Sequence, residues 1–189
     1  HFHNIAPEEY MNRLQKHGEI PFPPYVIERK ASPERYQTIL AEKEGSIAAP
    51  TAGLHFTYEL LQNLQKKEIE FCAVTLHVGI GTFAPLRVEH IQEHEMHPEF
   101  YALSAETAHR LNQQRKQGRR IVAVGTTSVR VLETVFRKHH CFCEETGETN
   151  LFIYPDQSID SIDALITNFH LPRSTLLMLV AAWMGRETI

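Results

Sequence analysis

Apolar positions along the chain follow two kinds of pattern, and each pattern predicts a different element. Spacings of three and four predict amphipathic helices, whose ends are marked by proline, serine, threonine or glycine. These helices cover residues 7–17, 32–45, 58–67 and 104–117, a stretch that follows Gly125, and residues 175–184. Short apolar runs predict strands at residues 71–78, 99–103, 121–124 and 164–167, and residues 141–150 with 151–154 predict a hairpin.

The order of these elements indicates the fold class. Strands and helices alternate along most of the chain, so we predict an α/β fold with a mostly parallel sheet flanked by helices. Three prolines within residues 20–26 exclude a helix or a central strand there and predict an extended linker. We therefore place a domain boundary near this linker, between residues 1–20 and residues 21–189. The chain begins at His1 and stops where a new helix would begin, so we expect it to be part of a longer polypeptide.

Four loops combine histidine or hydroxyl residues with small residues. The first is AAPTAGLHFT (residues 48–57), which displays His55 before a helix that Thr57 can cap. The others are residues 77–82, 125–130 and 168–172. Each loop has a purely structural alternative: an inward-bonded histidine, a tight turn, or plain helix capping. In open α/β sheets, ligands lie at the carboxyl ends of strands, so we predict that the four loops meet in one cleft.

A second histidine cluster offers a different chemistry. His90, His94 and His97 would share one face if residues 90–97 were helical, and three such histidines can bind zinc. Against this, Pro98 ends any helix, and no glutamate directly follows the first histidine as in zincins. A metal-dependent hydrolase using these three histidines remains one alternative.

Composition narrows the functional classes. The chain has 189 residues, of which 42% are hydrophobic and 22% charged, as in an ordinary globular protein. Its formal charge of −4 provides no global field for nucleic acid, so an RNA substrate would need a local basic surface, such as the cluster at residues 115–120. The three cysteines predict neither a disulfide framework nor a four-ligand zinc site, which favours a reducing compartment. The longest apolar run is shorter than the ~20 residues of a membrane-spanning helix.

Seven segments, in one order along almost the whole chain, resemble the S-adenosylmethionine:tRNA ribosyltransferase-isomerases of queuosine biosynthesis. They are IPFPPYV, ERYQTILAEKEGSIAAPTAGLHFT, VTLHVGIGTFAPL, HEMHPEFY, VAVGTTSVRVLE, TNLFIYP and LITNFHLPRSTLLMLVAAWMG.

The resemblance implies an enzyme that moves the ribosyl part of S-adenosylmethionine onto 7-aminomethyl-7-deazaguanine at the wobble position of tRNA. Epoxyqueuosine forms, and adenine and methionine leave. It implies a cytoplasmic enzyme with S-adenosylmethionine as co-substrate and no prosthetic group, metal or membrane partner; we favour a monomer. It also implies an α/β catalytic domain, incomplete at both ends here, whose inserted β-barrel domain is largely absent. Residues 1–20 would be the end of that inserted domain or its return connection. An inactive, truncated RNA-binding fragment is the other alternative.

The implied reaction requires a base for the proton on the ribose carbon beside the sulfonium, and an acid for the departing adenine. Histidine can serve as either near neutral pH. The resemblance and the loop positions give four catalytic candidates, with acid and base unassigned: His55, His77, His97 and His170. Candidate substrate-binding residues are Thr51, Gly53, Thr57, Gly79, Gly81, Thr82, Glu99, Gly125, Thr126, Thr127, Arg130 and Asn168.

Overall fold

The computed structural model describes residues 6–18, 36–79, 88 and 90–189. Its α-helices are α1 (Pro7–His17), α2 (Tyr58–Gln65), α3 (Ala105–Lys116), α4 (Thr126–His139) and α5 (Thr175–Met184). Two short 3-10 helices cover Thr51–His55 and Ile91–Glu93. The strands are β1 (Thr75–Leu76), β2 (Glu99–Leu103), β3 (Val122–Val124), β4 (Glu145–Thr149) and β5 (Ala164–Ile166).

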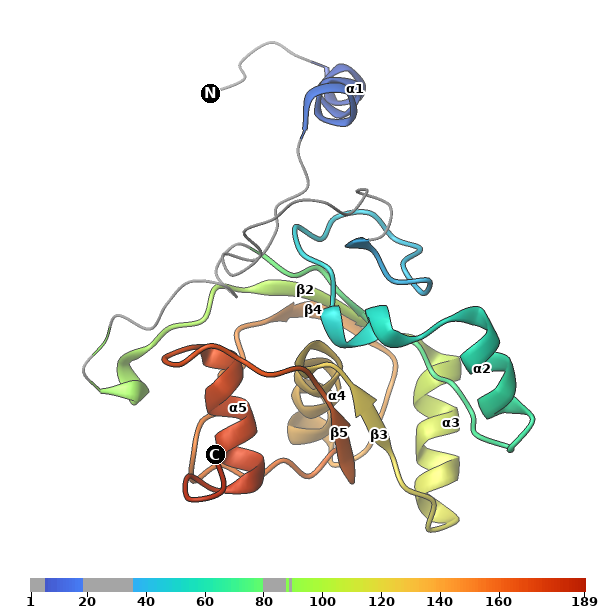
Figure 1. The fold of residues 1–189 in the computed structure, drawn as a ribbon, viewed down its shortest axis with the longest axis vertical. Helices are drawn as coiled ribbons and strands as arrows, with labels where there is room; N and C mark the ends of the chain where they lie inside the picture. The colour runs from blue at the N-terminus through green and yellow to red at the C-terminus, as the bar shows by residue number, and fades with distance from the viewer. Residues whose placement is uncertain (1–5, 19–35, 80–87, 89) are drawn as a thin grey trace.

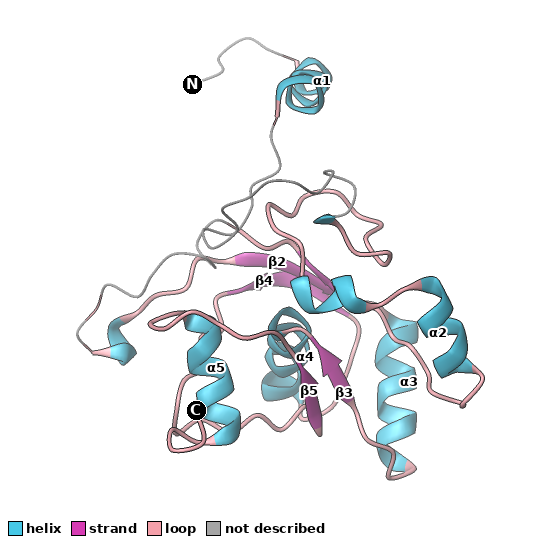
Figure 2. Ribbon diagram, in the orientation of Figure 1, coloured by secondary structure: helices cyan, strands magenta, loops and turns pink. Residues whose placement is uncertain are grey.

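The described strands form two separate sheets. One is antiparallel in the order β1-β2-β4, with Tyr101 opposite Gly147, and the other is the parallel pair β3-β5, with Val122 opposite Ala164. Helix α4 contacts strands of both sheets and lies between them (Figure 1). Figure 2 shows α3 and α5 on either side of this central helix, and α1 apart from these layers. The fold is therefore organised around α4.

Helix α4 is buried on most of its circumference. Val129, Val131 and Val135 are fully buried and belong to one core cluster with Tyr101 and Leu103 of β2. A helix that is apolar on several faces must pack against other elements on several sides, and α4 packs against both sheets. The predicted apolar stripe at Val129, Leu132 and Val135 is confirmed.

Two buried charges of α4 are bonded to the elements around it. Arg130 pairs with Glu99 at the start of β2 and also donates to the carbonyl oxygens of Leu151 and Thr149, at 3.1 and 3.4 Å. Glu133, which is fully buried, accepts hydrogen bonds from the backbone N–H groups of Asp160 and Ser161 just before β5. Arg130 bonds toward the antiparallel sheet, and Glu133 bonds toward the loop before β5. Together these bonds fix α4 to both sheets.

The predicted sheet is wrong in its main feature, because the larger described sheet is antiparallel. Strand β4 alternates between exposed and more buried residues, as expected of a strand with one face in solvent. The sequence ETGET was predicted as part of a hairpin around Gly147, yet the chain runs straight through this residue. Residues 151–154, the predicted second strand of that hairpin, form no strand. The parallel part of the prediction holds for β3 and β5 alone among the described strands.

Two other predicted elements differ. Residues 36–45 contain turns rather than the predicted α-helix, and residues 32–35 lie outside the described residues. The predicted strand at residues 71–78 shortens to β1, and its side chains are half-buried rather than buried on both faces. The apolar spacing behind the first prediction does not bury a helix face, since Leu40 is 48% exposed.

The helix starts that depend on a capping hydroxyl were predicted correctly. The side chains of Thr57, Ser104 and Ser174 accept hydrogen bonds from backbone N–H groups three residues later, at 3.1 to 3.2 Å. These hydroxyls satisfy donors that have no partner within the helix. Among the helices of the described segments, none combines the length and the apolar character that crossing a bilayer requires.

The buried ion pair predicts a large effect on stability. Arg130→Met leaves the Glu99 carboxylate buried without its cation, and we expect the free energy of unfolding to fall by about 3–5 kcal/mol. Glu99→Gln combined with Arg130→Met should recover part of that loss, since no charge then remains unpaired. Urea unfolding followed by circular dichroism measures both variants.

The exposed ion pair between Arg13 and Glu9 on α1 gives the matched control. Arg13→Met should change the free energy of unfolding by no more than about 1 kcal/mol, because solvent screens this pair. Equal losses in Arg13→Met and Arg130→Met would contradict the role given to the buried pair.

Candidate functional site

A pocket of about 90 Å³ lies at the carboxyl ends of β3 and β5, where Val124 and Ile166 lead into loops. All four loops that the sequence singled out contribute to its wall, which confirms their convergence. The lining residues are Ala49, Pro50, Thr51, Ala52, Val78, Gly125, Thr126, Thr127, Thr167, Asn168, Phe169, His170, Leu171, Ser174 and Leu176.

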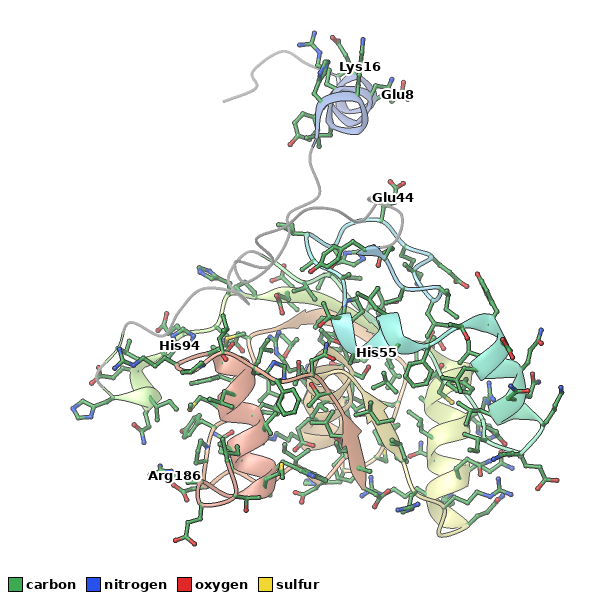
Figure 3. All side chains as sticks on the ribbon, viewed as in Figure 1. Glu8, Lys16, Glu44, His55, His94 and Arg186 are labelled. Atoms are coloured by element: carbon green, nitrogen blue, oxygen red, sulfur yellow. The ribbon has the colours of Figure 1, made fainter. Side chains whose placement is uncertain are left out.

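Hydrogen bonds through Asn168 tie two of the loops together. Its Nδ2 donates to Thr51 Oγ1 at 2.7 Å, and its Oδ1 lies 3.2 Å from His55 Nε2. Because the amide oxygen can only accept, His55 carries its proton on Nε2 and leaves Nδ1 available to a ligand. The His55 side chain is exposed, at the position labelled in Figure 3. Asn168 therefore sets both the place and the tautomer of this imidazole.

His170, unlike His55, lines the pocket itself. Its side chain is half-buried, and Nε2 lies 3.0 Å from the Thr167 hydroxyl. Burial lowers the pKa of His170, so the imidazole is neutral at pH 7 and can accept a proton. The site thus contains one exposed and one half-buried histidine.

The start of α4 supplies the third wall. Gly125, with φ of +88°, is the N-cap residue and makes no side-chain cap, so capping by Thr127 or Ser128, the structural alternative for this loop, is not observed. The Ser128 hydroxyl instead donates to the Val124 carbonyl at 2.8 Å. The N-terminus of α4 carries a partial positive charge, which favours an anionic or hydroxyl-bearing group in the pocket.

Gly53 serves packing rather than ligand contact. A Cβ on this residue would lie 2.9 Å from Thr38 Cγ2, so the 3-10 helix can approach Thr38 only with glycine here. Gly53 is buried and does not line the pocket.

Several predicted residues lie elsewhere. The His77 ring packs on Phe100 with centroids 5.1 Å apart, whereas its neighbour Val78 lines the pocket. His97 is exposed, and Thr57 caps α2. Outside the pocket lining are also Gly79, Glu99 and Arg130; Gly81 and Thr82 lie outside the described residues.

Glu99 and Arg130 pair with each other inside the protein instead of facing a ligand. The carboxylate of Glu99 accepts from Gly79 N–H at 2.7 Å as well as from Arg130, and both side chains are nearly fully buried. Their charges therefore hold β2, α4 and the backbone beside Val78 in place, which shapes the pocket without entering it.

The second histidine cluster is not assembled for metal binding. Residues 91–93 form a single 3-10 turn, so His90, His94 and His97 do not share a helix face. The His94 ring packs on Phe152 with centroids 5.0 Å apart, far from His55 in Figure 3. Within the described residues, these three histidines form no group of close ligand atoms, and the metal-dependent hydrolase is not favoured.

Among the pocket residues that the sequence analysis did not select, two stand next to selected ones and can act on a ligand or a catalytic candidate. Thr167 hydrogen-bonds His170, and the Phe169 side chain is fully exposed at the pocket. Both flank predicted residues in the segment TNFHLP, so contiguity with Asn168 and His170 was the available signal. A fully exposed phenylalanine in a wall of a pocket offers a ring face to a planar ligand.

Comparison with known proteins identifies the family. The model of the queuosine biosynthesis protein family matches residues 1–189. The chain belongs to this family. A relative in Staphylococcus haemolyticus, an S-adenosylmethionine:tRNA ribosyltransferase-isomerase, is 53% identical to this chain over all 189 residues. The matched region covers 54% of that protein. The Staphylococcus aureus (strain JH9) protein of the same name is 52% identical with the same coverage.

A solved structure of this family is also similar. The S-adenosylmethionine tRNA ribosyltransferase of Thermotoga maritima is 50% identical, with a TM-score of 0.58 over 72% of this chain and 42% of that one. The chain spans about half the length of the curated relatives it matches.

The buried histidines predict a stability change with pH. Burial lowers the pKa of His170, and burial followed by the neighbouring His97 lowers that of His94. The unfolded chain therefore binds more protons as the pH falls below about 6.5, and the free energy of unfolding decreases. Urea titrations at about pH 7.5 and about pH 5.5 should show this loss, and His170→Asn or His94→Gln should each reduce it.

His109, exposed on α3, provides the control. His109→Gln should keep the loss of stability between the two pH values seen in the unmodified protein. A pH dependence that is the same in all four proteins would contradict this assignment.

Proposed function

We propose that this chain contributes the ribosyl-binding pocket of an S-adenosylmethionine:tRNA ribosyltransferase-isomerase. The reaction transfers and isomerises the ribosyl moiety of S-adenosylmethionine onto 7-aminomethyl-7-deazaguanine at the tRNA wobble position, with release of adenine and methionine. The observation that carries this proposal is that, in a member of this family, Asn168 and His170 line one pocket with the N-terminus of α4, and Asn168 also bonds to His55 outside the pocket lining.

The two histidines take different roles in the proposed reaction. His170, neutral because burial lowers its pKa, removes the proton from the ribose carbon beside the sulfonium. His55 donates from Nδ1 to the departing adenine when protonated, while the Asn168 carbonyl accepts from Nε2–H and orients the ring. Proton removal then comes from a histidine that lines the pocket, and leaving-group protonation from a histidine bonded to the lining residue Asn168.

The size of the pocket limits what it holds. About 90 Å³ is less than the roughly 300–1,000 Å³ of pockets for drug-sized ligands, so we assign to it the ribose and its immediate neighbours. Thr126 and Thr127 offer hydroxyls at the positive end of α4, suited to the ribose hydroxyls. Phe169 lies exposed at the same pocket, and we assign it to stacking on the acceptor base of the tRNA.

The tRNA backbone requires cations outside this pocket. Arg115 donates to carbonyl oxygens of Asp160 and Ser161, so it is used in the fold rather than free for phosphate. Lys116, Arg119 and Arg120 are exposed at the end of α3, and we assign phosphate contacts to them.

The remaining expectations extend this proposal. We infer a cytoplasmic, monomeric enzyme that uses S-adenosylmethionine as co-substrate and no prosthetic group. Residues 1–20 would belong to the end of an inserted domain or its return connection, and residues 21–189 to the α/β catalytic domain. The separate position of α1 in Figure 1 supports that division.

Kinetics of the full-length protein test the roles of the histidines. His170→Ala and His55→Ala should each lower kcat by about 100- to 10,000-fold, the range for loss of a general acid or base. Asn168→Ala should lower kcat by up to about 100-fold, because His55 loses its orientation. Adenine release from S-adenosylmethionine in the presence of tRNA measures all three.

His109→Ala, on the exposed face of α3, is the matched control and should keep the unmodified rate. Full rate in both His55→Ala and His170→Ala would refute the site. Tight tRNA binding without any adenine release by the unmodified protein would favour the RNA-binding alternative instead.

Stacking by Phe169 makes a separate prediction. Phe169→Ala should raise the KM for tRNA by roughly 5- to 100-fold, matching the ~1–3 kcal/mol of a base–aromatic contact, with a smaller effect on the KM for S-adenosylmethionine. Tyr58→Ala removes another exposed aromatic ring from α2, away from the pocket lining, and should leave both constants unchanged. An unchanged KM for tRNA in Phe169→Ala would refute the stacking role.

A further inference from the structure

A group of metal-ligand side chains lies at the end of α4 that is remote from the pocket. The ligand atoms of His139, Cys143 and Glu145 all lie within 4.8 Å of one another. The pocket is at the N-terminus of α4, and a helix of 14 residues is about 20 Å long, so this group is separate from the proposed active site. Neither the family nor the proposed reaction assigns it a role.

The backbone brings these three residues together from two elements. His139 is the last residue of α4, and Glu145 is the first residue of β4. Between them, His140 adopts a left-handed conformation with φ of 55° and ends the helix. Strand β4 is paired along its length with β2, so both ends of the connection are anchored in regular structure.

The spacing of the donor atoms suits a small tetrahedral ion. His139 Nε2 lies 3.1 Å from Glu145 Oε2. Two ligands bonded to zinc at about 2.0–2.1 Å in tetrahedral geometry lie roughly 3.3 Å apart. The two atoms therefore need only small movements to admit an ion between them and the Cys143 sulfur.

The C-terminal end of α4 favours a cation beside this donor set. The last carbonyl groups of α4 place partial negative charge beside His139. Glu145 is held by Lys138, whose Nζ lies 2.7 Å from Oε1, which leaves Oε2 facing His139. A thiolate at Cys143 and the Glu145 carboxylate together neutralise a divalent ion, and Lys138 remains bonded to the outer oxygen.

We propose that His139, Cys143 and Glu145 bind one zinc ion that joins the C-terminus of α4 to β4. Imidazole nitrogen with thiolate sulfur selects zinc over magnesium or calcium, which prefer oxygen ligands alone. Cys141, an exposed thiol two residues before Cys143, is the candidate for the fourth ligand. The ion is structural, because it lies about 20 Å from the proposed chemistry.

Zinc titration of the full-length protein, dialysed against chelator and freed of any purification tag, tests this site. Calorimetry should show one zinc per chain, and zinc should raise the midpoint of thermal unfolding. Cobalt in place of zinc should give the absorption of thiolate-to-metal charge transfer. Cys143→Ser and His139→Ala should each weaken zinc binding at least tenfold, and Cys143→Ser should remove the cobalt absorption.

Two neighbours give matched controls. Cys72 is a free, half-buried thiol outside the group, and His140 is the exposed histidine next to His139. Cys72→Ser and His140→Ala should keep the affinity of the unmodified protein. Circular dichroism before titration confirms that each variant is folded.

Three outcomes would overturn the proposal. The first is an unmodified protein that binds no zinc at micromolar concentration. The second is unchanged affinity in Cys143→Ser or in His139→Ala. The third is loss of binding in His94→Ala with retention in His139→Ala, which would place the ion at the other histidine cluster.

Discussion

The ion pair between Arg130 and Glu99 is the interaction on which the arrangement of the other elements depends. It joins α4 to β2 inside the core, and its remaining bonds reach the backbone of residues 149 and 151 and of Gly79. Charges at such depth are tolerated only when every donor and acceptor has a partner, so the pair specifies one position of α4 against the antiparallel sheet. Glu133, one helical turn later, fixes α4 to the loop before β5.

The position of α4 in turn determines the pocket. The start of the helix forms one wall, and the parallel pairing of β3 with β5 brings Asn168 and His170 beside it. Asn168 then links this edge to Thr51 and His55, which are more than a hundred residues earlier in the chain. The loops are therefore held by two neighbouring elements, by one amide and by the short 3-10 helix at Thr51–His55.

Local features of the fold were predictable from sequence, and long-range pairing was not. The hydroxyl caps at Thr57, Ser104 and Ser174 and the buried stripe of α4 depend on residues within one or two turns of each other. The antiparallel sheet depends on β2 meeting β4 across more than forty residues, and alternation within ETGET does not reveal a partner. The same limit explains why the hairpin around Gly147 was wrong.

The candidate site shows a related limit. Loop position predicted that four segments meet, and the pocket confirms it. Residue type alone could not show which side chains face a ligand and which bond to other parts of the protein. Arginine suits a substrate carboxylate and a buried glutamate equally well, and only burial shows that Arg130 is bonded to Glu99. His77 and Val78 make the same point, since the apolar residue lines the pocket and the histidine packs on Phe100. The chemistry of a residue becomes a function only when the fold leaves that residue exposed to a ligand, as it does for His170 and Phe169 in the pocket lining and for His55 next to Asn168.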